Sequence, residues 1–416
     1  MSQTYRRNES DEETPSLSRR RFLAGAAAAS FVLATPGAVR TYAANSKVNL
    51  GLIGCGGRGG WIADLFVRHG GFNVTAVADY FPDRTNGVGD RFNVPASRRH
   101  TGLSGYRKLL EQVDAVAIES PPYFHPEQAA TAVNAGKHVY LAKPIAVDTA
   151  GCLSVADSGK RASEQKLCFL VDFQTRADPY YIEALRRVHE AKAIGAFAFG
   201  EANYQEGDPF GRMVETWQAD PQNPENRLRA WGLDKLLSGD IITEQNIHTL
   251  DVMNWIMGQP PIHAVGTGGR KYRSVGTCYD TFSVLFQYPD HVGVTFNSRQ
   301  FEGHGSQPEG IRNRMFGDQG VLETAYGGQV IIRGQNFYRG GRSPGIYEEG
   351  AVANIKTFHD SITAGKFDNP TVEPSVQSNL ITILGRTAAY EQRLVTWSEL
   401  LAKKEKLDAG LKGLKA

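Results

Sequence analysis

A glycine-rich loop near residue 54 constrains this 416-residue chain more than any other feature of its sequence. The loop reads Gly54-Cys55-Gly56-Gly57-Arg58-Gly59 and follows 48–53, a short apolar run typical of a buried parallel strand. Residues 61–68, just after the loop, have helical spacing. A strand, a glycine turn and a helix in this order form the dinucleotide-binding fingerprint, because the glycines permit a tight turn and a close approach to a pyrophosphate.

The loop and the end of the next strand together predict the nucleotide. A helix N-terminus offers free N–H groups and a positive dipole to phosphates. Asp79 ends the next apolar run, 20 residues after Gly59. A carboxylate there accepts hydrogen bonds from the adenosine ribose and repels a 2′-phosphate, which favours NAD. Arg84 lies near enough in the sequence to leave NADP open. The expected cofactor-binding residues of this part are Gly54, Gly56, Gly57, Arg58, Gly59 and Asp79.

Strands and helices alternate up to about residue 165, and this alternation predicts a doubly wound parallel sheet over 46–165. Beyond it, strand-like runs with hairpin spacing occur at 281–288, 292–299, 321–324 and 329–332. We therefore expect a second α+β domain over 166–395, with a large, mostly antiparallel open sheet. Within it, 208–234 is interpreted as a long functional loop and 247–255 as an amphipathic helix. Residues 396–416 are expected to form a charged, frayed tail.

The first 43 residues resemble an export signal. Ser18-Arg19-Arg20-Arg21-Phe22-Leu23 precedes a weakly apolar run that ends at Val39, and Ala43 is a suitable cleavage position. Paired arginines before such a run are typical of the twin-arginine route, which favours a periplasmic or otherwise exported protein. An uncleaved anchor is the alternative, although the run is short and contains Pro36. Because this route moves folded proteins, a nucleotide would have to be acquired in the cytoplasm and retained.

Charge and cysteine content exclude several classes of function. The formal net charge of +2 offers no basic excess for nucleic acid or for a membrane surface. The four cysteines, Cys55, Cys152, Cys168 and Cys278, form no C-x-x-C pair and no zinc-like cluster, so we expect no metal site. One disulfide bridge remains open for an exported chain.

Further informative segments are Glu119–His125, Ala135–Val139 leading into Ala142-Lys143-Pro144, Phe173–Arg176 and Gly239–Asp251. With the glycine loop, they resemble the glucose–fructose oxidoreductase/inositol dehydrogenase/MocA (Gfo/Idh/MocA) family over nearly all of residues 46–400. In the family, Ala142-Lys143-Pro144 is usually Glu-Lys-Pro, and the position of Glu244 is usually aspartate. The alanine removes a charge next to the cofactor and Lys143, whereas Glu244 keeps the charge of the usual aspartate.

The resemblance implies roles for individual residues. Lys143 would hydrogen-bond the reacting hydroxyl beside the nicotinamide, after a cis bond to Pro144, and His248 would exchange the substrate proton. Glu244, four residues before His248, would orient and charge its imidazole, with Asp251 as a further partner on the same helix face. Cofactor contacts are expected from Ser120, Pro121, His125, Lys143 and Gln174, and substrate contacts from Arg176, Tyr204, Arg229, Trp231 and Asp251. For Trp231, anchoring of the loop is an equal alternative.

Together these features predict an NAD(P)-dependent oxidoreductase that acts on a sugar, glycoside or cyclitol hydroxyl with tightly bound NAD. A redox-neutral hydrolase or lyase, working through a transient keto-sugar, is the second hypothesis, and a non-catalytic sensor is the third. The expected partner is a small carbohydrate, with no stable membrane insertion after signal cleavage. The exposed sheet expected from 281–332 also predicts a homo-oligomer.

Overall fold

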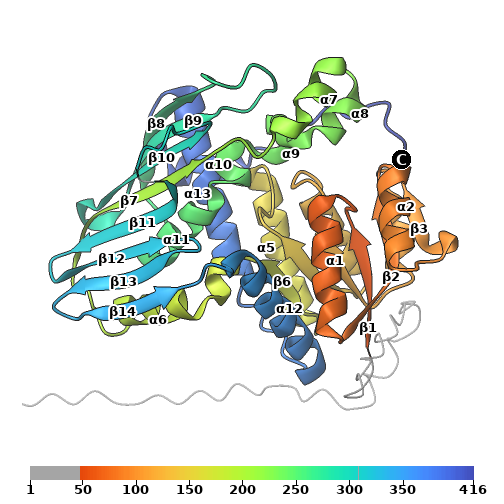
Figure 1. The fold of residues 1–416 in the computed structure, drawn as a ribbon, viewed down its shortest axis with the longest axis horizontal. Helices are drawn as coiled ribbons and strands as arrows, with labels where there is room; N and C mark the ends of the chain where they lie inside the picture. Colours follow the sequence, from red (N-terminus) through yellow and green to blue (C-terminus); the bar gives the residue numbers. More distant parts are fainter. Residues whose placement is uncertain (1–46, 308) are drawn as a thin grey trace, which may run out of the picture. The chain divides into compact units, whose positions relative to one another are not determined.

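The structure is a computed structural model that describes residues 47–307 and 309–416. The predicted signal segment, residues 1–43, lies outside the described residues. The first sheet contains six parallel strands in the order β3-β2-β1-β4-β5-β6 (Figure 1). They span Val48–Ile53 (β1), Phe72–Asp79 (β2), Arg99–Thr101 (β3), Ala115–Ile118 (β4), His138–Ala142 (β5) and Phe169–Asp172 (β6).

Helices bury both faces of this sheet, and alternate strand residues therefore enter two different cores. Val116 and Ile118 pack into one core, whereas Ala115 and Ala117 pack into the other. The helices within this part of the chain are α1 (Gly57–His69), α2 (Pro82–Arg91), α3 (Gly105–Leu110), α4 (His125–Asn134) and α5 (Thr149–Glu164). The core against α1 is completed by α12, residues Ile346–Ala364, which the sequence analysis did not assign.

The boundary expected at residue 165 is wrong by one strand. Residues Phe169–Asp172 form β6, which pairs in parallel with β5 at the edge of the first sheet. All four residues of β6 are buried, because this short run packs between the helix layers rather than in the second domain.

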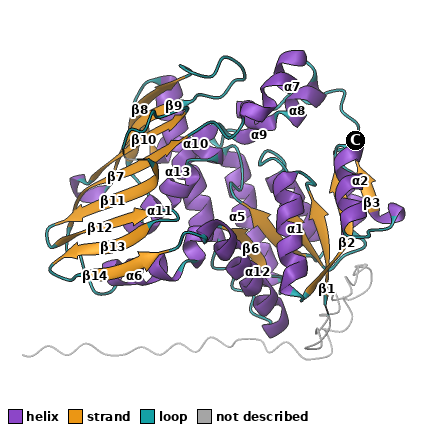
Figure 2. Ribbon diagram, in the orientation of Figure 1, coloured by secondary structure: helices purple, strands orange, loops and turns teal. Residues whose placement is uncertain are grey.

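The second sheet has nine strands in the order β14-β13-β12-β11-β7-β10-β9-β8-β15, and only β10 and β7 run parallel. Figure 2 shows this broad sheet with helices on one side. The predicted fold class, a parallel doubly wound sheet followed by a mostly antiparallel open sheet, is confirmed. The strands are β7 (Phe197–Glu206), β8 (His263–Gly269), β9 (Thr281–Gln287), β10 (Gly293–Gln300), β11 (Gly310–Gly317), β12 (Gly320–Ala325), β13 (Gln329–Gly334), β14 (Tyr338–Arg342) and β15 (Val395–Thr396).

One face of the second sheet packs on helices α6 (Pro179–His189), α11 (Ile247–Met257) and α13 (Val372–Glu391). Strand β10 shows the alternation that results: Val294 and Phe296 are buried, whereas Thr295 and Asn297 are exposed. The expected amphipathic helix is therefore wrong in character. Every residue of α11 except Trp255 is buried, because the helix lies between the sheet and α13.

The expected loop over 208–234 is also wrong, because it contains short helices. These are α7 (Val214–Ala219) and α8 (Pro224–Arg229), followed by the helical turns Trp231–Leu233 and α9 (Lys235–Ser238). The side chain of Asn223 accepts the amide N–H of Glu225 and Asn226, and Pro224 occupies the first turn of α8. Asparagine and proline, which suggested a loop, act here as helix start signals.

The tail is not frayed. Helix α14 (Trp397–Lys403) is followed by residues 404–416, which return to the first sheet and end beside α2 (Figure 1). Ala409 is 1% exposed, and Leu411 and Leu414 pack in an apolar cluster. Apolar residues interspersed among the tail's charges provide this contact. Within 47–307 and 309–416, no helix is both long and apolar enough to span a membrane.

Candidate active site

The glycine loop has the geometry that a dinucleotide requires. Gly59 lies against the loop so closely that a Cβ there would come 1.9 Å from the carbonyl oxygen of Gly54. Gly54 has φ +97°, which only glycine adopts readily. In contrast, a Cβ on Gly57 would meet no atom within 4 Å, and α1 has no side-chain cap at Gly56. The first-turn N–H groups of α1 thus border open space, as pyrophosphate binding requires.

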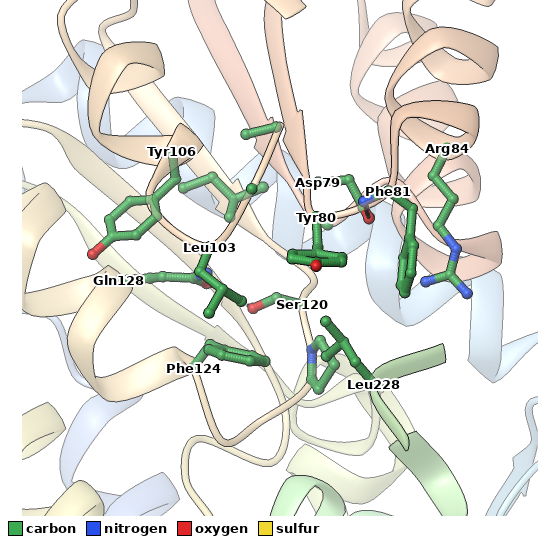
Figure 3. A pocket seen from close by; sticks show the side chains of 15 residues that line it. Asp79, Tyr80, Phe81, Arg84, Leu103, Tyr106, Ser120, Phe124, Gln128 and Leu228 are labelled. Atoms are coloured by element: carbon green, nitrogen blue, oxygen red, sulfur yellow. Dashed lines mark hydrogen bonds between the residues drawn. The ribbon is translucent and has the colours of Figure 1, made fainter. Parts of the chain in front are cut away.

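Asp79 stands at the end of β2 beside this loop. Its carboxylate accepts the amide N–H of Cys55 at 2.8 Å and of Phe81 at 2.9 Å, while burial raises its pKa. A pocket opens next to it (Figure 3). Its mixed aromatic and polar lining fits the adenosine half of NAD. The lining consists of Ile53, Gly54, Ala78, Asp79, Tyr80, Phe81, Arg84, Gly102, Leu103, Tyr106, Ser120, Pro121, Phe124, Gln128 and Leu228.

Of the three residues expected to contact the cofactor after β4, two line this pocket and the third does not. Ser120 and Pro121 are in the lining, and the Ser120 hydroxyl donates to Gln128 Oε1 at 2.6 Å. His125 is 1% exposed, and its ring nitrogens lie 2.8 Å from the carbonyl oxygen of Pro144 and 2.7 Å from that of Ser120. Burial lowers the pKa of His125 to about 4, whereas the two carbonyls act in the opposite direction, and the ring joins these two loops.

The side chain of Arg58 pairs with groups of the protein, which leaves its expected cofactor contact to the backbone N–H in the first turn of α1. Its Nε lies 3.0 Å from Glu119 Oε2, its guanidinium also pairs with Asp172, and it donates to Tyr347 Oη at 3.1 Å. The side chain of Glu119 is completely buried, and burial raises its pKa to about 7. Glu119 and Asp172 were missed by the sequence analysis, although each lies at the carboxyl end of a parallel strand, where ligand sites gather.

Lys143 lies at the end of β5, and its bond to Pro144 is cis, as the resemblance implied. Its Nζ donates to the backbone carbonyl of Glu244 at 2.7 Å and lies 3.6 Å from Glu244 Oε1. The two side chains are only 7% and 10% exposed. Burial lowers the pKa of Lys143, and the Glu244 carboxylate opposes that change. The amine is therefore closer to neutrality than a surface lysine.

Glu244 does not orient His248, which corrects the expected helical pair. Helix α10 (Ile241–Glu244) ends before α11 begins at Ile247, so the i and i+4 relation on one helix does not hold. The Glu244 carboxylate instead accepts from Gln245 Nε2 and faces Lys143, and Gln245 Oε1 accepts the Tyr204 hydroxyl at 2.6 Å. Tyr204 thus borders the site by holding Gln245.

His248 is buried and uncharged. Burial lowers the pKa of His248 well below its usual value, and the charges of Lys143 and Arg58 lower it further. Lys143 bonds the backbone carbonyl of Glu244, and the amide N–H of His248 bonds that of Gln245, so the two expected catalytic residues lie in one neighbourhood. Within the described residues, His248 Nδ1 has no hydrogen-bond partner. Its ring centroid is 5.4 Å from that of Tyr326, whose hydroxyl is likewise unpaired among residues 47–307 and 309–416.

Gln174 adds another unpaired polar atom to this buried region. It lies in the turn Gln174–Ala177 that follows β6, and its Nε2 donates to Asp172 Oδ2 at 3.1 Å. Its Oε1 finds no partner in the described part of the chain. Buried polar atoms without partners are rare in folded proteins and mark places where a ligand can complete the hydrogen bonding. Tyr326 lies in the tight turn between β12 and β13, and no sequence signal singled it out.

Arg176 and Asp251, expected to contact substrate, are paired with each other. Arg176 donates three hydrogen bonds of 2.8–3.0 Å to the Asp251 carboxylate, which is fully buried. Ser378 on α13 also donates to Asp251 at 2.6 Å. These bonds join α11 to the turn after β6 and to α13. Asp251 is therefore not a hydrogen-bond partner of His248. The charges of Arg176 and Asp251 instead hold these elements together.

Arg229 and Trp231 lie on the adenosine side, beside Phe81 and its apolar cluster. Arg229 pairs with Asp83 at 3.1 Å and stacks over the Phe81 ring at 3.9 Å. Trp231 packs edge-on against Phe210, with ring centroids 5.9 Å apart. Their side chains hold α8 and the following turn against the nucleotide-binding half, and the expected sugar contact of both stays a prediction. For Trp231 the loop-anchoring alternative describes the contact.

Comparisons with known proteins agree with this arrangement. Residues 48–173 match the family model described as "Oxidoreductase family, NAD-binding Rossmann fold". Residues 182–323 match the model of the GFO/IDH/MocA C-terminal domain. The chain belongs to the Gfo/Idh/MocA family. Its nucleotide is NAD, and the chain is an NAD-dependent oxidoreductase of the Gfo/Idh/MocA type.

Several Gfo/Idh/MocA relatives are similar to this chain. An inositol 2-dehydrogenase 2 from Saccharopolyspora erythraea is 29% identical over 226 residues, which are 54% of this chain and 58% of that protein. A glycosyl hydrolase family 109 protein from Streptomyces coelicolor is 29% identical over 183 residues, 37% of this chain and 39% of that protein. The structure of scyllo-inositol dehydrogenase from Lactobacillus casei with NAD(H) and scyllo-inositol has a TM-score of 0.65 at 19% identity, covering 84% and 99% of the two chains.

Proposed function

We propose that this protein transfers a hydride between NAD, held as a retained cofactor, and a hydroxyl-bearing carbon of a sugar, glycoside or cyclitol. The observation that carries the proposal is the buried cluster of Lys143, Glu244 and His248 beside the nucleotide-binding sheet. The similarity to inositol dehydrogenases supports a polyhydroxylated substrate.

The residues of the cluster act on the reacting hydroxyl in different ways. Oxidation of a carbinol removes a hydride and a proton, and NAD, when bound, accepts the hydride. The neutral imidazole of His248 accepts the proton. The Lys143 Nζ hydrogen-bonds the same oxygen, and Glu244 holds that amine in place. In the reverse direction His248 returns the proton.

A second candidate is a redox-neutral glycoside hydrolase or lyase. The similarity to a glycosyl hydrolase family 109 protein favours it, as does the presence of two separate proton-handling groups, Lys143 and His248. In this reaction the first oxidation acidifies a neighbouring C–H and elimination releases the glycosidic substituent, leaving an unsaturated ketone. In a hydrolase water adds to this ketone before the carbonyl is reduced again. Retained NAD is regenerated in each cycle.

The proposal includes export with the nucleotide already bound. The paired arginines at 19–21 support the twin-arginine route, which transports folded proteins. An exported enzyme that kept its NAD would couple the oxidation of one substrate to the reduction of another, or complete a redox-neutral cycle, without a free nucleotide pool.

One purification tests both candidates. The nucleotide released by denaturation is identified by mass spectrometry, and absorbance near 340 nm is then followed with a panel of cyclitols, free sugars and aryl glycosides. Net reduction of NAD by a cyclitol or free sugar supports the oxidoreductase. Release of the aglycone without lasting change at 340 nm supports the hydrolase. A chain that binds NAD but changes neither signal with any polyol or glycoside would contradict the proposal.

A further inference from the structure

The segment after α14 follows the nucleotide-binding half of the molecule over its whole length. The carbonyl oxygen of Glu405 accepts the amide N–H of Ala150 at 3.0 Å, and the amide N–H of Leu407 donates to Asp148 Oδ2 at 2.7 Å. Further along, the amide N–H of Ala409 donates to a tyrosine hydroxyl, that of Tyr123, at 3.4 Å. Residues 404–416 are called the strap below.

The distal end of the strap is tied to two particular residues. The carbonyl oxygen of Lys415 accepts the amide N–H of Leu103 at 3.0 Å, and its own amide N–H donates to Tyr80 Oη at 3.3 Å. Between these ties and the middle of the strap, Leu411 and Leu414 pack into the apolar cluster that contains Phe81. Charged strap residues, including Lys412, face solvent.

The residues that the strap holds form the outer wall of the adenosine pocket. Tyr80, Phe81 and Leu103 line that pocket together with Phe124 and Leu228 (Figure 3). All five residues belong to the apolar cluster in which the strap's leucines pack. The strap therefore contacts the wall from outside, while the nucleotide site lies on its inner side.

The same wall is held from a second direction. Tyr80 Oη donates to Glu225 Oε1 on α8 at 2.6 Å, and Arg229 stacks over Phe81. Two segments distant in the sequence, α8 and the strap, thus meet over one pocket. Outward movement of Tyr80 or Leu103 breaks hydrogen bonds to the strap and exposes its leucines to water.

We propose that the strap is part of the cofactor site: it braces the adenosine wall and slows the release of NAD. The inference rests on the proposed function, which requires retained NAD, and it names the segment responsible for retention. Local opening of this wall limits release, because an adenosine enclosed by it leaves only when the wall moves.

The test compares a strap variant with a matched control. In the double variant Leu411→Ser/Leu414→Ser the apolar contact is lost, whereas Lys412→Ser changes an exposed residue of the same segment. Each protein is loaded with isotope-labelled NAD and chased with excess unlabelled NAD. We expect release to accelerate about 10-fold or more in the double variant and to stay unchanged in the control, because lost apolar contacts chiefly raise dissociation rates. Equal rates of NAD release from wild type, the double variant and the control, each with a cooperative thermal transition, would overturn the proposed role of the strap.

A measurement on the unaltered chain covers the case of a misfolded variant. Hydrogen exchange of peptides from 404–416 and from the Leu103 region is followed with and without NAD. We expect NAD to slow exchange in both peptides, because a nucleotide in the pocket and a strap in place against the wall stabilise each other. Exchange rates that are the same with and without NAD would overturn the inference while leaving the proposed function intact. A wild-type chain that binds no NAD at all would instead overturn the proposed function and the strap with it.

Discussion

Replacing Glu244 with glutamine should separate the role of Lys143 in chemistry from its role in the fold. The Nζ–Oε1 distance is 3.6 Å, and both side chains are almost fully buried. At an effective dielectric constant of about 20, that distance corresponds to a gross attraction of about 4–5 kcal/mol. Removing one partner of a buried pair usually destabilises a protein by about 3–5 kcal/mol. Because Lys143 keeps its bond to the backbone carbonyl at residue 244, we expect about 3 kcal/mol at neutral pH.

The sign of the pH dependence follows from the direction of the pKa. Burial lowers the pKa of Lys143, and the variant loses the carboxylate that opposes this effect. The unfolded chain then binds a proton that the folded variant releases, so the stability of Glu244→Gln rises with pH below the ordinary lysine pKa of about 10.4. The destabilisation relative to wild type should therefore be large at pH 6 and small near pH 10, as measured by urea unfolding.

Turnover supplies the second readout. The part of the kcat–pH profile that belongs to Lys143 should move to lower pH in Glu244→Gln, and Lys143→Met should lower turnover about 10²–10⁴-fold while NAD stays bound. Glu348→Gln is a matched control, because its pair with Arg68 is exposed and such pairs contribute about 0–1 kcal/mol. An unshifted profile in Glu244→Gln, or a Lys143→Met protein with more than about a tenth of wild-type turnover, would refute this assignment.

Three further changes test other parts of the molecule. Asp79→Ser should shift nucleotide preference toward NADP in a binding titration, because the repulsion of a 2′-phosphate disappears; a wild type that already prefers NADP would contradict this reading. Burial raises the pKa of Glu119 from 4.5 to about 7, so the unfolded chain releases this proton first as the pH rises. The free energy of unfolding of wild type should therefore fall by about 3 kcal/mol, relative to Glu119→Gln, as the pH rises from about 4.5 to about 7. A constant difference between the two proteins in urea unfolding would argue against this. Phe199 is exposed on the open face of the second sheet and stacks on Phe316. We expect light scattering to show an oligomer that Phe199→Asp dissociates, and a wild-type monomer at micromolar concentration would remove that expectation.

Local sequence patterns predicted the fold well where one short segment contains the whole physical cause. The glycine loop is such a case, since Gly54 and Gly59 satisfy backbone constraints set within a few residues. Strand-like runs with hairpin spacing predicted β9 and β10 for the same reason. The four-residue strand β6 was assigned to the wrong domain, because its membership depends on a neighbour, β5, about 30 residues away.

Charge partners could not be predicted from spacing alone. Arg176 and Asp251 are 75 residues apart and saturate each other, while Lys143 meets Glu244 from 101 residues away. The helical relation between Glu244 and His248 failed because the chain turns between α10 and α11. Glu119 shows the opposite kind of miss: its position after a buried strand was visible, but its burial against Arg58 requires the folded structure.

During synthesis, the core of the nucleotide-binding half depends on helix α12, a late part of the chain. Ala351, Ile355 and Phe358 complete the core that contains Phe66 and Tyr140, so residues 47–173 alone would expose that apolar surface to water. A nascent chain cannot close this core until residues 346–364 have left the ribosome, nearly 300 residues after the glycine loop. Stable capture of NAD is thereby postponed to a late stage of translation, and any transplant of the first sheet into another protein must carry α12 with it.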